Sequence, residues 1–217
     1  MTQQQISRPK AFIFDWDNTL VSSWDMIYDI MNHTLKKFRG ETWAMEKIKE
    51  NTHLSAKDNF PKLFGNKAEE ALTELRRYAE ENHTNYLDSL QKMPGALDLL
   101  KYLQENKIPC AIVSNKHAKR LRIEVEHMGW NAYFTAIYGS TDFPHDKPHP
   151  YPAERAIEAN KIEAAHTWFV GDTPADWDCA RNSDCQPIAV GDLTHLDTLP
   201  KKIFTDLKTL LDGLKAA

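Results

Sequence analysis

Four short apolar segments, separated by stretches with helical periodicity, constrain the fold of this chain more than any other feature. They span residues 11–14, 109–113, 167–170 and 187–190, and a weaker candidate spans residues 135–138. Short continuous apolar segments are typical of strands that are buried on both faces of a parallel sheet. Strands that alternate with helices form βαβ units, so the pattern predicts an α/β fold, a parallel sheet with helices on both faces.

The stretches between these segments carry apolar residues at intervals of three or four, as one face of a packed helix requires. One stripe contains Leu97, Leu100 and Leu103, a second contains Ala118, Leu121, Val125 and Met128, and a third contains Ile203, Leu207, Leu210, Leu211 and Leu214. We expect these stripes to lie on helices that cover the sheet.

Between the first and second apolar segments the alternation is interrupted, because helical periodicity continues there without a convincing strand. One helical stripe begins at Trp24, which we therefore expect to pack against other helices, and Gly40 is a plausible stop for this helix. We expect a helical subdomain of residues 21–93, inserted into a core formed by residues 1–20 and 94–217.

The composition is that of a globular protein and excludes several classes. Of 217 residues 41% are apolar, and 27 Lys and Arg against 31 Asp and Glu give a net charge of −4. This balance offers no broad cationic face, so neither nucleic acid nor an anionic membrane is expected as a partner. No apolar run approaches the roughly 18 residues of a membrane helix. The three cysteines form no Cys-x-x-Cys pair, which favours a reducing, cytoplasmic location.

Polar side chains stand where three of the predicted strands end. Asp15 and Asp17 follow the first strand, Ser114 and Asn115 follow the second, and Asp172 follows the third. In an open parallel sheet the carboxyl ends of the strands border the ligand crevice. We therefore expect these side chains to lie close together although they are far apart in the sequence.

The expected crevice contains four carboxylates, those of Asp15, Asp17, Asp172 and Asp176. Like charges at close quarters raise one another's pKa values unless a cation intervenes. A hard divalent cation with oxygen ligands is the usual partner of such a group, and Mg²⁺ fits because it binds carboxylates together with a phosphate oxygen.

Other residues of the crevice suit a phosphoryl group. Lys147 can supply a positive charge, and Ser114, Asn115 and Thr19 can supply hydrogen-bond donors. A phosphoryl group in transfer spreads negative charge over three oxygens, which such donors stabilise. Asp15 directly follows the strand and could attack phosphorus. Asp17 could protonate the leaving oxygen and then activate water.

These residues resemble the motifs of a known family. The segments Asp15-Trp16-Asp17-Asn18-Thr19-Leu20, Ser114-Asn115, Lys147-Pro148 and Gly171-Asp172-Thr173-Pro174-Ala175-Asp176 resemble, in order, the four motifs of the haloacid dehalogenase superfamily. The helical insert after the first motif resembles the C1-capped subgroup. The sequence Lys147-Pro148-His149-Pro150 resembles most closely the branch of phosphoglycolate phosphatase-like proteins.

The resemblance implies a Rossmann-like core with a mobile helical cap, in which Asp15 is the nucleophile and Asp17 the general acid and base. It implies Mg²⁺ held by the Asp15 side chain, the Asp17 main-chain carbonyl and Asp172. Asp176 would support the metal directly or through water. The acid at position 17 favours phosphate chemistry over carbon–halogen chemistry, because the dehalogenases lack it.

The same resemblance implies a phosphate site formed by the first, second and third motifs. Its members are Trp16, Thr19, Ser114, Asn115 and Lys147. Ser114 and Lys147 would hold phosphate oxygens, and Lys147 would also orient the nucleophile.

The implied activity is Mg²⁺-dependent hydrolysis of a small phosphomonoester, such as 2-phosphoglycolate, through an aspartyl-phosphate. The partner would be a small phosphorylated metabolite, and the protein a monomer or homodimer. A sugar phosphomutase and a nucleotide monophosphatase are alternatives on the same fold. A catalytically silent binding module is an alternative from a different class, although Asp15, Asp17 and Lys147 are all present.

Three positions depart from the family pattern. Asn18 stands where most relatives carry glycine, and asparagine tolerates a left-handed backbone better than other residues with a side chain. Ser22-Ser23 replaces a frequent Asp-Ser pair, and Asn182-Ser183 replaces a frequent Ala-Gly pair. The last two weaken the transfer of substrate identity rather than that of chemistry.

Some of these residues also have a simpler interpretation. Asp172 and Asp176 could cap a helix that begins near Pro174. His145 and His149 are polar loop residues more often than zinc ligands in a site of hard oxygen donors. The basic side chains that follow the second motif could attract an anionic substrate, but we favour a solvated helix face for them. They are Lys116, Lys119, Arg120 and Arg122.

Overall fold

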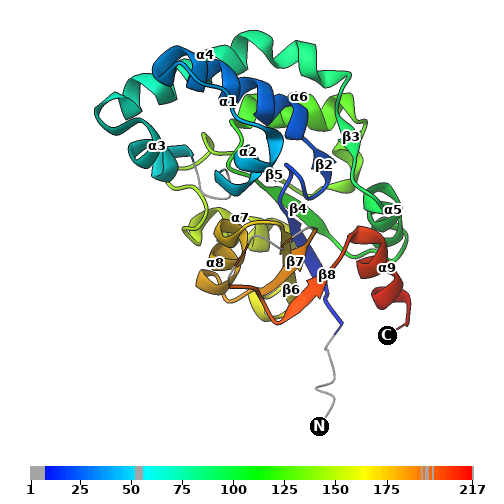
Figure 1. Ribbon diagram of the computed structural model, residues 1–217. Coiled ribbons are helices and arrows are strands. Elements are labelled where there is room, and N and C mark those ends of the chain that lie inside the picture. Colours follow the sequence, from blue (N-terminus) through cyan, green and yellow to red (C-terminus); the bar gives the residue numbers. More distant parts are fainter. Residues whose placement is uncertain (1–7, 52–55, 192, 194–195, 197, 217) are drawn as a thin grey trace.

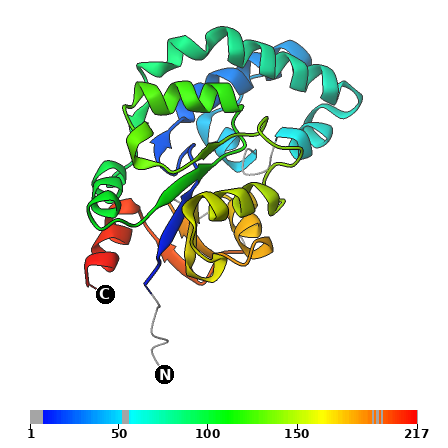
Figure 2. The ribbon, with the colours of Figure 1, turned by 180° about the vertical axis from the view of Figure 1, so that it is seen from behind.

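The fold is built on one twisted parallel sheet (Figures 1 and 2). The computed structural model describes residues 8–51, 56–191, 193, 196 and 198–216. Within these residues six strands form the sheet in the order β5-β4-β1-β6-β7-β8, with every neighbouring pair parallel. The strands are β1 (Ala11–Phe14), β4 (Cys110–Val113), β5 (Ile137–Tyr138), β6 (Thr167–Gly171), β7 (Gln186–Val190) and β8 (Lys202–Phe204).

Strand β1 lies inside the sheet, which suits a strand whose side chains are all apolar and can be buried on both faces. All four of its residues are fully buried. Phe12 pairs with Cys110 of β4 on one side and with Trp168 of β6 on the other. The four predicted strands and the weaker candidate are all present, each within two residues of its expected start.

Helices cover both faces of the sheet, so the predicted fold class is confirmed. On one face Phe12 and Phe14 pack against α5 (Ala96–Glu105), α6 (Ala118–His127) and α9 (Leu207–Ala216). On the other face Ile13 packs with side chains of α7 (Tyr151–Asn160) and α8 (Pro174–Asn182). Single-turn 3₁₀ helices occur at Gly65–Lys67, Asn131–Tyr133 and Ala164–His166.

Four helices lie together beyond one end of the sheet (Figure 1). They are α1 (Trp24–Arg39), α2 (Met45–Asn51), α3 (Ala56–Phe64) and α4 (Ala68–Leu87). Helix α1 ends at Gly40, as predicted, where the backbone adopts a φ of 70°. The group has an apolar cluster of its own, which contains Met31, Leu35, Trp43, Ile48, Phe60, Phe64 and Ala71. The division of the chain into a core and a mobile cap stays a prediction.

Two expectations about strands are wrong. The helical interval is bounded by a two-stranded antiparallel sheet of β2 (Val21–Ser22) and β3 (Gln91–Lys92). Two residues are too few to produce an alternating pattern of apolar and polar side chains, so these strands could not be predicted from the sequence. Ile203, assigned to a helical stripe, instead lies on edge strand β8 and is 48% exposed. The helix after it begins only at Leu207.

Two further observations concern the environment of the protein. Cys110, Cys179 and Cys185 are buried and carry free thiols. In the part of the chain that the structure describes, every helix is too short or too polar to cross a bilayer.

Candidate active site

Polar residues from three strand ends and one loop meet at a single pocket. The pocket has a volume of about 430 Å³ and lies between the sheet edge and the helices α1 to α4. Asp15 follows β1, Ser114 follows β4, Asp172 follows β6, and Lys147 comes from the loop before α7. All four side chains line this pocket. The sheet topology therefore brings together residues that are up to 157 positions apart.

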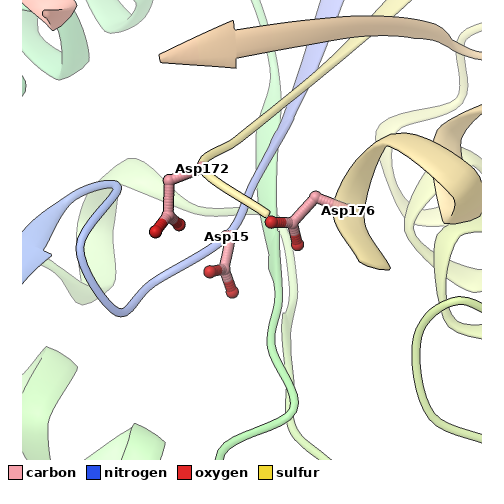
Figure 3. A group of neighbouring side chains, drawn as sticks. All are labelled: Asp15, Asp172 and Asp176. Carbon is pink, nitrogen blue, oxygen red and sulfur yellow. The ribbon is translucent and has the colours of Figure 1, made fainter. Parts of the chain in front are cut away.

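Three carboxylates lie close together, two at the floor of the pocket and one buried behind it. Oxygen atoms of Asp15, Asp172 and Asp176 all lie within 4.8 Å of one another, and Figure 3 shows the three groups converging on one space. Asp176 lines no part of the pocket itself and is fully buried. Three of the four predicted metal ligands thus meet through their side chains.

Lys147 lies between two of these carboxylates. Its Nζ donates hydrogen bonds to Oδ1 of Asp15 and to Oδ1 of Asp176, each at 2.6 Å. Asn115 fixes the lysine from behind, because its amide donates to the Lys147 carbonyl at 3.0 Å and accepts from the Lys147 N–H at 2.9 Å. Asn115 therefore borders the pocket, but its side chain serves the loop that carries Lys147.

Asp176 also organises the start of helix α8. Its Oδ2 accepts hydrogen bonds from the N–H and the hydroxyl of Thr173, at 2.9 Å and 2.6 Å, which forms a capping box. Gly171 makes room for this carboxylate: a Cβ at position 171 would lie 2.4 Å from the Cβ of Asp176. The interpretation of Asp176 as a helix cap is therefore correct, and it coexists with the contact to Lys147.

The acidic group carries more negative charge than its surroundings neutralise. Burial raises the pKa of Asp15 to about 7, and although Lys147 opposes this shift, Asp176 and Asp17 add to it. Burial and the charges of Asp15 and Asp176 likewise raise the pKa of Asp172 well above its ordinary value. A divalent cation among these oxygens would restore the ionised forms, so the donor set fits Mg²⁺.

The side chain of Asp17 turns away from the other three carboxylates. Its Oδ1 accepts hydrogen bonds from the Ser23 hydroxyl and from Nζ of Lys116, the latter at 2.7 Å. The Lys116 side chain is only 5% exposed, so its assignment to a solvated helix face is wrong. Lys116 precedes α6, which begins at Ala118, and therefore does not share the exposed face of that helix.

A buried carboxylate that the sequence analysis missed lies behind Lys116. Glu124 of α6 accepts from Nζ of Lys116 at 2.6 Å, from the Trp16 indole at 2.7 Å and from the His83 ring at 2.9 Å. These donors lower the pKa of Glu124 to about 2 although burial opposes the shift. In the sequence Glu124 is one of many charged residues on an amphipathic helix, so no local signal distinguishes it.

Two predicted phosphate-binding residues turn their side chains elsewhere. The indole of Trp16 is fully buried in the apolar core and bonds to Glu124, so only the main chain of residue 16 is left for a phosphate. The hydroxyl of Thr19 donates to Oδ1 of Asp172 at 3.0 Å and thereby orients a candidate metal ligand. Among the predicted phosphate-binding residues, those that line the pocket are Ser114, Asn115 and Lys147.

The helical insert contributes the opposite wall of the pocket. This wall is largely apolar and includes Trp24, Met26, Ile27, Ile30, Met31, Phe60, Leu75 and Ala79. Trp24 is half-buried and lines the pocket, so the packing expected from its apolar stripe describes only part of its surroundings. The ammonium of Lys49 lies 5.2 Å from the centre of the Trp24 ring. Arg120 of α6 also lines the pocket, so two cations, Lys49 and Arg120, stand in its walls.

The departures from the family pattern fit the local structure. Asn18 adopts a φ of 59°, the left-handed conformation that the sequence analysis expected it to tolerate. Its side-chain oxygen accepts from the Ser23 N–H at 3.1 Å and closes the turn that follows Asp17. Ser183 caps the end of α8 through its hydroxyl, which donates to the Cys179 carbonyl at 2.8 Å.

Comparison with known proteins identifies the family. The family model described as haloacid dehalogenase-like hydrolase matches residues 12–190. This chain belongs to that family. The resemblance inferred from the four motifs is therefore confirmed, and so is the predicted enzyme class, a hydrolase.

Individual relatives agree over nearly the whole length. Pyrophosphatase PpaX of Oceanobacillus iheyensis is 28% identical over 207 residues, which cover 93% of this chain and 95% of that protein. Among solved structures, a superfamily hydrolase from Ehrlichia chaffeensis has a TM-score of 0.67 and 27% identity, with 98% of each chain covered. A predicted phosphoglycolate phosphatase from Haemophilus somnus has a TM-score of 0.76, 20% identity and coverage of 96% and 99%, which establishes a shared fold.

Proposed function

We propose that this protein is a Mg²⁺-dependent phosphatase that hydrolyses a small phosphomonoester through a phosphorylated Asp15. The observation that carries the proposal is the placement of Lys147 at 2.6 Å from both Asp15 and Asp176, beside Asp172, at the floor of a pocket. A nucleophilic carboxylate, a fixed cation and a metal-binding carboxylate set are together what phosphoryl transfer requires.

In the first step an oxygen of Asp15 attacks phosphorus while the bond from phosphorus to the ester oxygen breaks. Protonated Asp17 gives its proton to the leaving oxygen, so the product leaves as an alcohol or a phenol. Lys147 and the Ser114 hydroxyl bind oxygens of the transferring group, whose negative charge they stabilise. The product of this step is an aspartyl-phosphate on Asp15.

In the second step water attacks the phosphorus of the aspartyl-phosphate. Asp17, now ionised, takes a proton from this water, and the bond between phosphorus and the Asp15 oxygen breaks. Inorganic phosphate leaves, and Asp15 and Asp17 return to their starting forms. Asp17 lines the pocket, and Ser23 and Lys116 hold its carboxylate through Oδ1, so the same side chain can serve both steps.

The metal would be held by the carboxylates of Asp15 and Asp172. Asp176 would support it from behind, since both of its oxygens already bond to Lys147 and Thr173. When bound, Mg²⁺ supplies positive charge that keeps these carboxylates ionised and offsets the charge of the phosphoryl group.

The pocket walls favour a leaving group with an apolar part and a second negative charge. The apolar wall around Trp24 and Phe60 suits hydrocarbon or a ring, and the cations Lys49 and Arg120, which also line the pocket, suit a carboxylate or a further phosphate. The expected substrate 2-phosphoglycolate provides a carboxylate. Inorganic diphosphate, suggested by the name of the PpaX relatives, would meet the cations but leave the apolar wall without contacts.

A panel of phosphate esters tests the proposal. Purified protein with Mg²⁺ is given 2-phosphoglycolate, sugar phosphates, nucleoside monophosphates, diphosphate and 4-nitrophenyl phosphate, and released phosphate is measured. Hydrolysis that stops with EDTA and with Asp15→Asn supports the phosphatase. A sugar bisphosphate product in place of free phosphate would identify a mutase. A folded protein that turns over none of these compounds would be a binding module.

The location and the oligomeric state are separate questions. Free, buried cysteines are consistent with the reducing cytoplasm, where we place the reaction. Light scattering of the active protein distinguishes a monomer from a homodimer.

A further inference from the structure

A buried polar cluster joins the helical insert to the sheet domain. It consists of Glu124 with its three donors Lys116, His83 and Trp16, and we refer to it as the Glu124 cluster. Oε1 of Glu124 accepts from His83 at 2.9 Å and from Lys116 at 2.7 Å, and Oε2 accepts from Trp16 at 2.7 Å and from Lys116 at 2.6 Å. Both carboxylate oxygens are therefore fully used.

The members of the cluster come from separate parts of the fold. His83 lies on α4, Glu124 lies on α6, and Lys116 follows the Ser114-Asn115 motif. The side chains of His83 and Glu124 are 5% and 1% exposed. Neither residue lines the pocket, so direct contact with a substrate does not explain them.

The Glu124 cluster is an unfavourable way to stabilise a contact between two helices, in terms of folding free energy. Burying a carboxylate and an ammonium together gains little stability over an apolar pair of the same size. The exposed pair of Lys119 with Glu80, at 3.0 Å, also joins α6 to α4. The feature that only the Glu124 cluster has is its next contact, because Nζ of Lys116 lies 2.7 Å from Oδ1 of Asp17.

We propose that Glu124 and His83 are positioning residues that hold Lys116, and through it the Asp17 carboxylate, so that helix α4 sets the orientation of the acid and base. The inference rests on the role of Asp17 in the proposed function. With three hydrogen bonds from Lys116 to the two carboxylates, a shift of α4 against α6 moves the ammonium that holds Asp17.

This role predicts a dependence on the leaving group. A phenolate is basic and leaves slowly without a proton, whereas 4-nitrophenolate leaves readily without one. A misplaced Asp17 therefore lowers kcat/KM for phenyl phosphate much more than for 4-nitrophenyl phosphate. A general loss of folded protein lowers both values by the same factor.

The experiment compares these two esters in four proteins. They are the wild type, His83→Leu, which removes the donor to Glu124, His83→Gln, which keeps one, and Lys119→Met. Lys119→Met is the matched control, because it removes the exposed ion pair between the same two helices and leaves Asp17 untouched. Circular dichroism confirms that each variant is folded.

We expect His83→Leu to lower kcat/KM for phenyl phosphate about tenfold or more, and for 4-nitrophenyl phosphate less than about threefold. His83→Gln restores most of the loss, and Lys119→Met leaves the ratio of the two values at that of the wild type. A double variant, Lys116→Met with Glu124→Gln, removes both buried charges together and shows the same change in ratio.

The inference would be overturned if His83→Leu lowered kcat/KM for the two esters by the same factor. It would also be overturned if Lys119→Met changed the ratio of the two values as much as His83→Leu does. If the double variant does not fold, the two His83 variants decide. These outcomes differ from a failure of the proposed function, in which the wild type hydrolyses neither ester.

Discussion

Nζ of Lys147 lies 2.6 Å from Oδ1 of Asp15, although 132 residues separate them in the sequence. Both side chains are almost completely buried, at 3% and 9% exposure. The same ammonium contacts Asp176, which in turn caps α8. The proposed nucleophile is therefore fixed through a single lysine to the helix that follows the third strand end.

Removal of this lysine should affect both activity and stability. Lys147→Met deletes a donor to the transferring phosphoryl group, and we expect kcat/KM for 4-nitrophenyl phosphate to fall about 100-fold or more. It also leaves two buried carboxylates without their cation, which should lower the free energy of unfolding by about 3–5 kcal/mol. Lys101→Met, an exposed lysine on α5, is the control. A loss of activity below about tenfold would refute the role of Lys147.

The pH dependence of the metal-free protein follows from the raised pKa of Asp15. The folded state holds the Asp15 proton up to about pH 7, whereas the unfolded chain releases it near 3.8. Stability from this group is therefore fully present below pH 3.8 and is lost as the pH rises toward 7, by about 4 kcal/mol at most.

Urea unfolding in EDTA, at about pH 5 and about pH 8, measures this effect. Asp15→Asn should be more stable than the wild type at the higher pH, because the asparagine has no charge to bury. Asp178→Asn, an exposed aspartate on α8, should keep the pH dependence of the wild type. If Asp15→Asn loses as much stability as the wild type between the two pH values, the proposed cause is wrong.

A small substitution behind the site should be disproportionately harmful. In Gly171→Ala the new Cβ would lie 2.4 Å from Cβ and Cγ of Asp176, so the carboxylate that holds Lys147 must move. We expect a loss of about 1–3 kcal/mol in the free energy of unfolding, together with reduced kcat.

Gly213→Ala is the matched control for this change. It lies within α9, and its Cβ would lie 3.5 Å from Phe204, an ordinary contact. We expect it to be neutral or stabilising by up to about 1 kcal/mol. Equal effects of the two substitutions on thermal unfolding would show that the space at residue 171 is not limiting.

Metal binding can be measured without turnover. Mg²⁺ at about 100 times its dissociation constant should stabilise the folded protein by about 2.7 kcal/mol, seen as a higher melting temperature. Asp172→Asn should abolish most of the rise because it removes a converging carboxylate. Asp178→Asn should retain it. A rise of equal size in Asp172→Asn would exclude the proposed metal site.

The cations Lys49 and Arg120, which line the pocket, predict a preference among substrates. A 4-carboxyphenyl phosphate carries a carboxylate on its ring that phenyl phosphate lacks, so the wild type should have the higher kcat/KM for it. Arg120→Gln or Lys49→Gln should lower that preference about tenfold, the value of one charged hydrogen bond. Lys62→Gln, an exposed lysine on α3, should keep it. A preference that survives both substitutions would assign the carboxylate to another contact.

Much of the site follows from the sequence, because it depends on strand ends. The apolar segments before Asp15, Ser114 and Asp172 predict buried parallel strands, and parallel strands bring their carboxyl ends to one edge. The roles of these residues are implied by the family motifs, and the third motif also places Lys147 at the same edge. The separation of these residues in the sequence did not prevent the prediction, since the topology of a parallel sheet brings its strand ends together.

Contacts between helices could not be predicted in this way. His83 and Glu124 are 41 positions apart, and their hydrogen bond depends on how α4 crosses α6, which helical periodicity does not determine. Trp24 likewise begins an apolar stripe, yet that stripe faces a cavity as well as other helices. Periodicity identifies the apolar face of a helix but not the neighbour that covers it.

Strands β2 and β3 place the two ends of the helical insert side by side, with Val21 opposite Lys92 and Ser22 opposite Gln91. Because the insert leaves and rejoins the core at adjacent points, an insert of different length could replace it without a change in the topology of the parallel sheet. Substrate selectivity can thus diverge by exchange of this one continuous segment, while the residues at the strand ends, which perform the chemistry, are inherited unchanged.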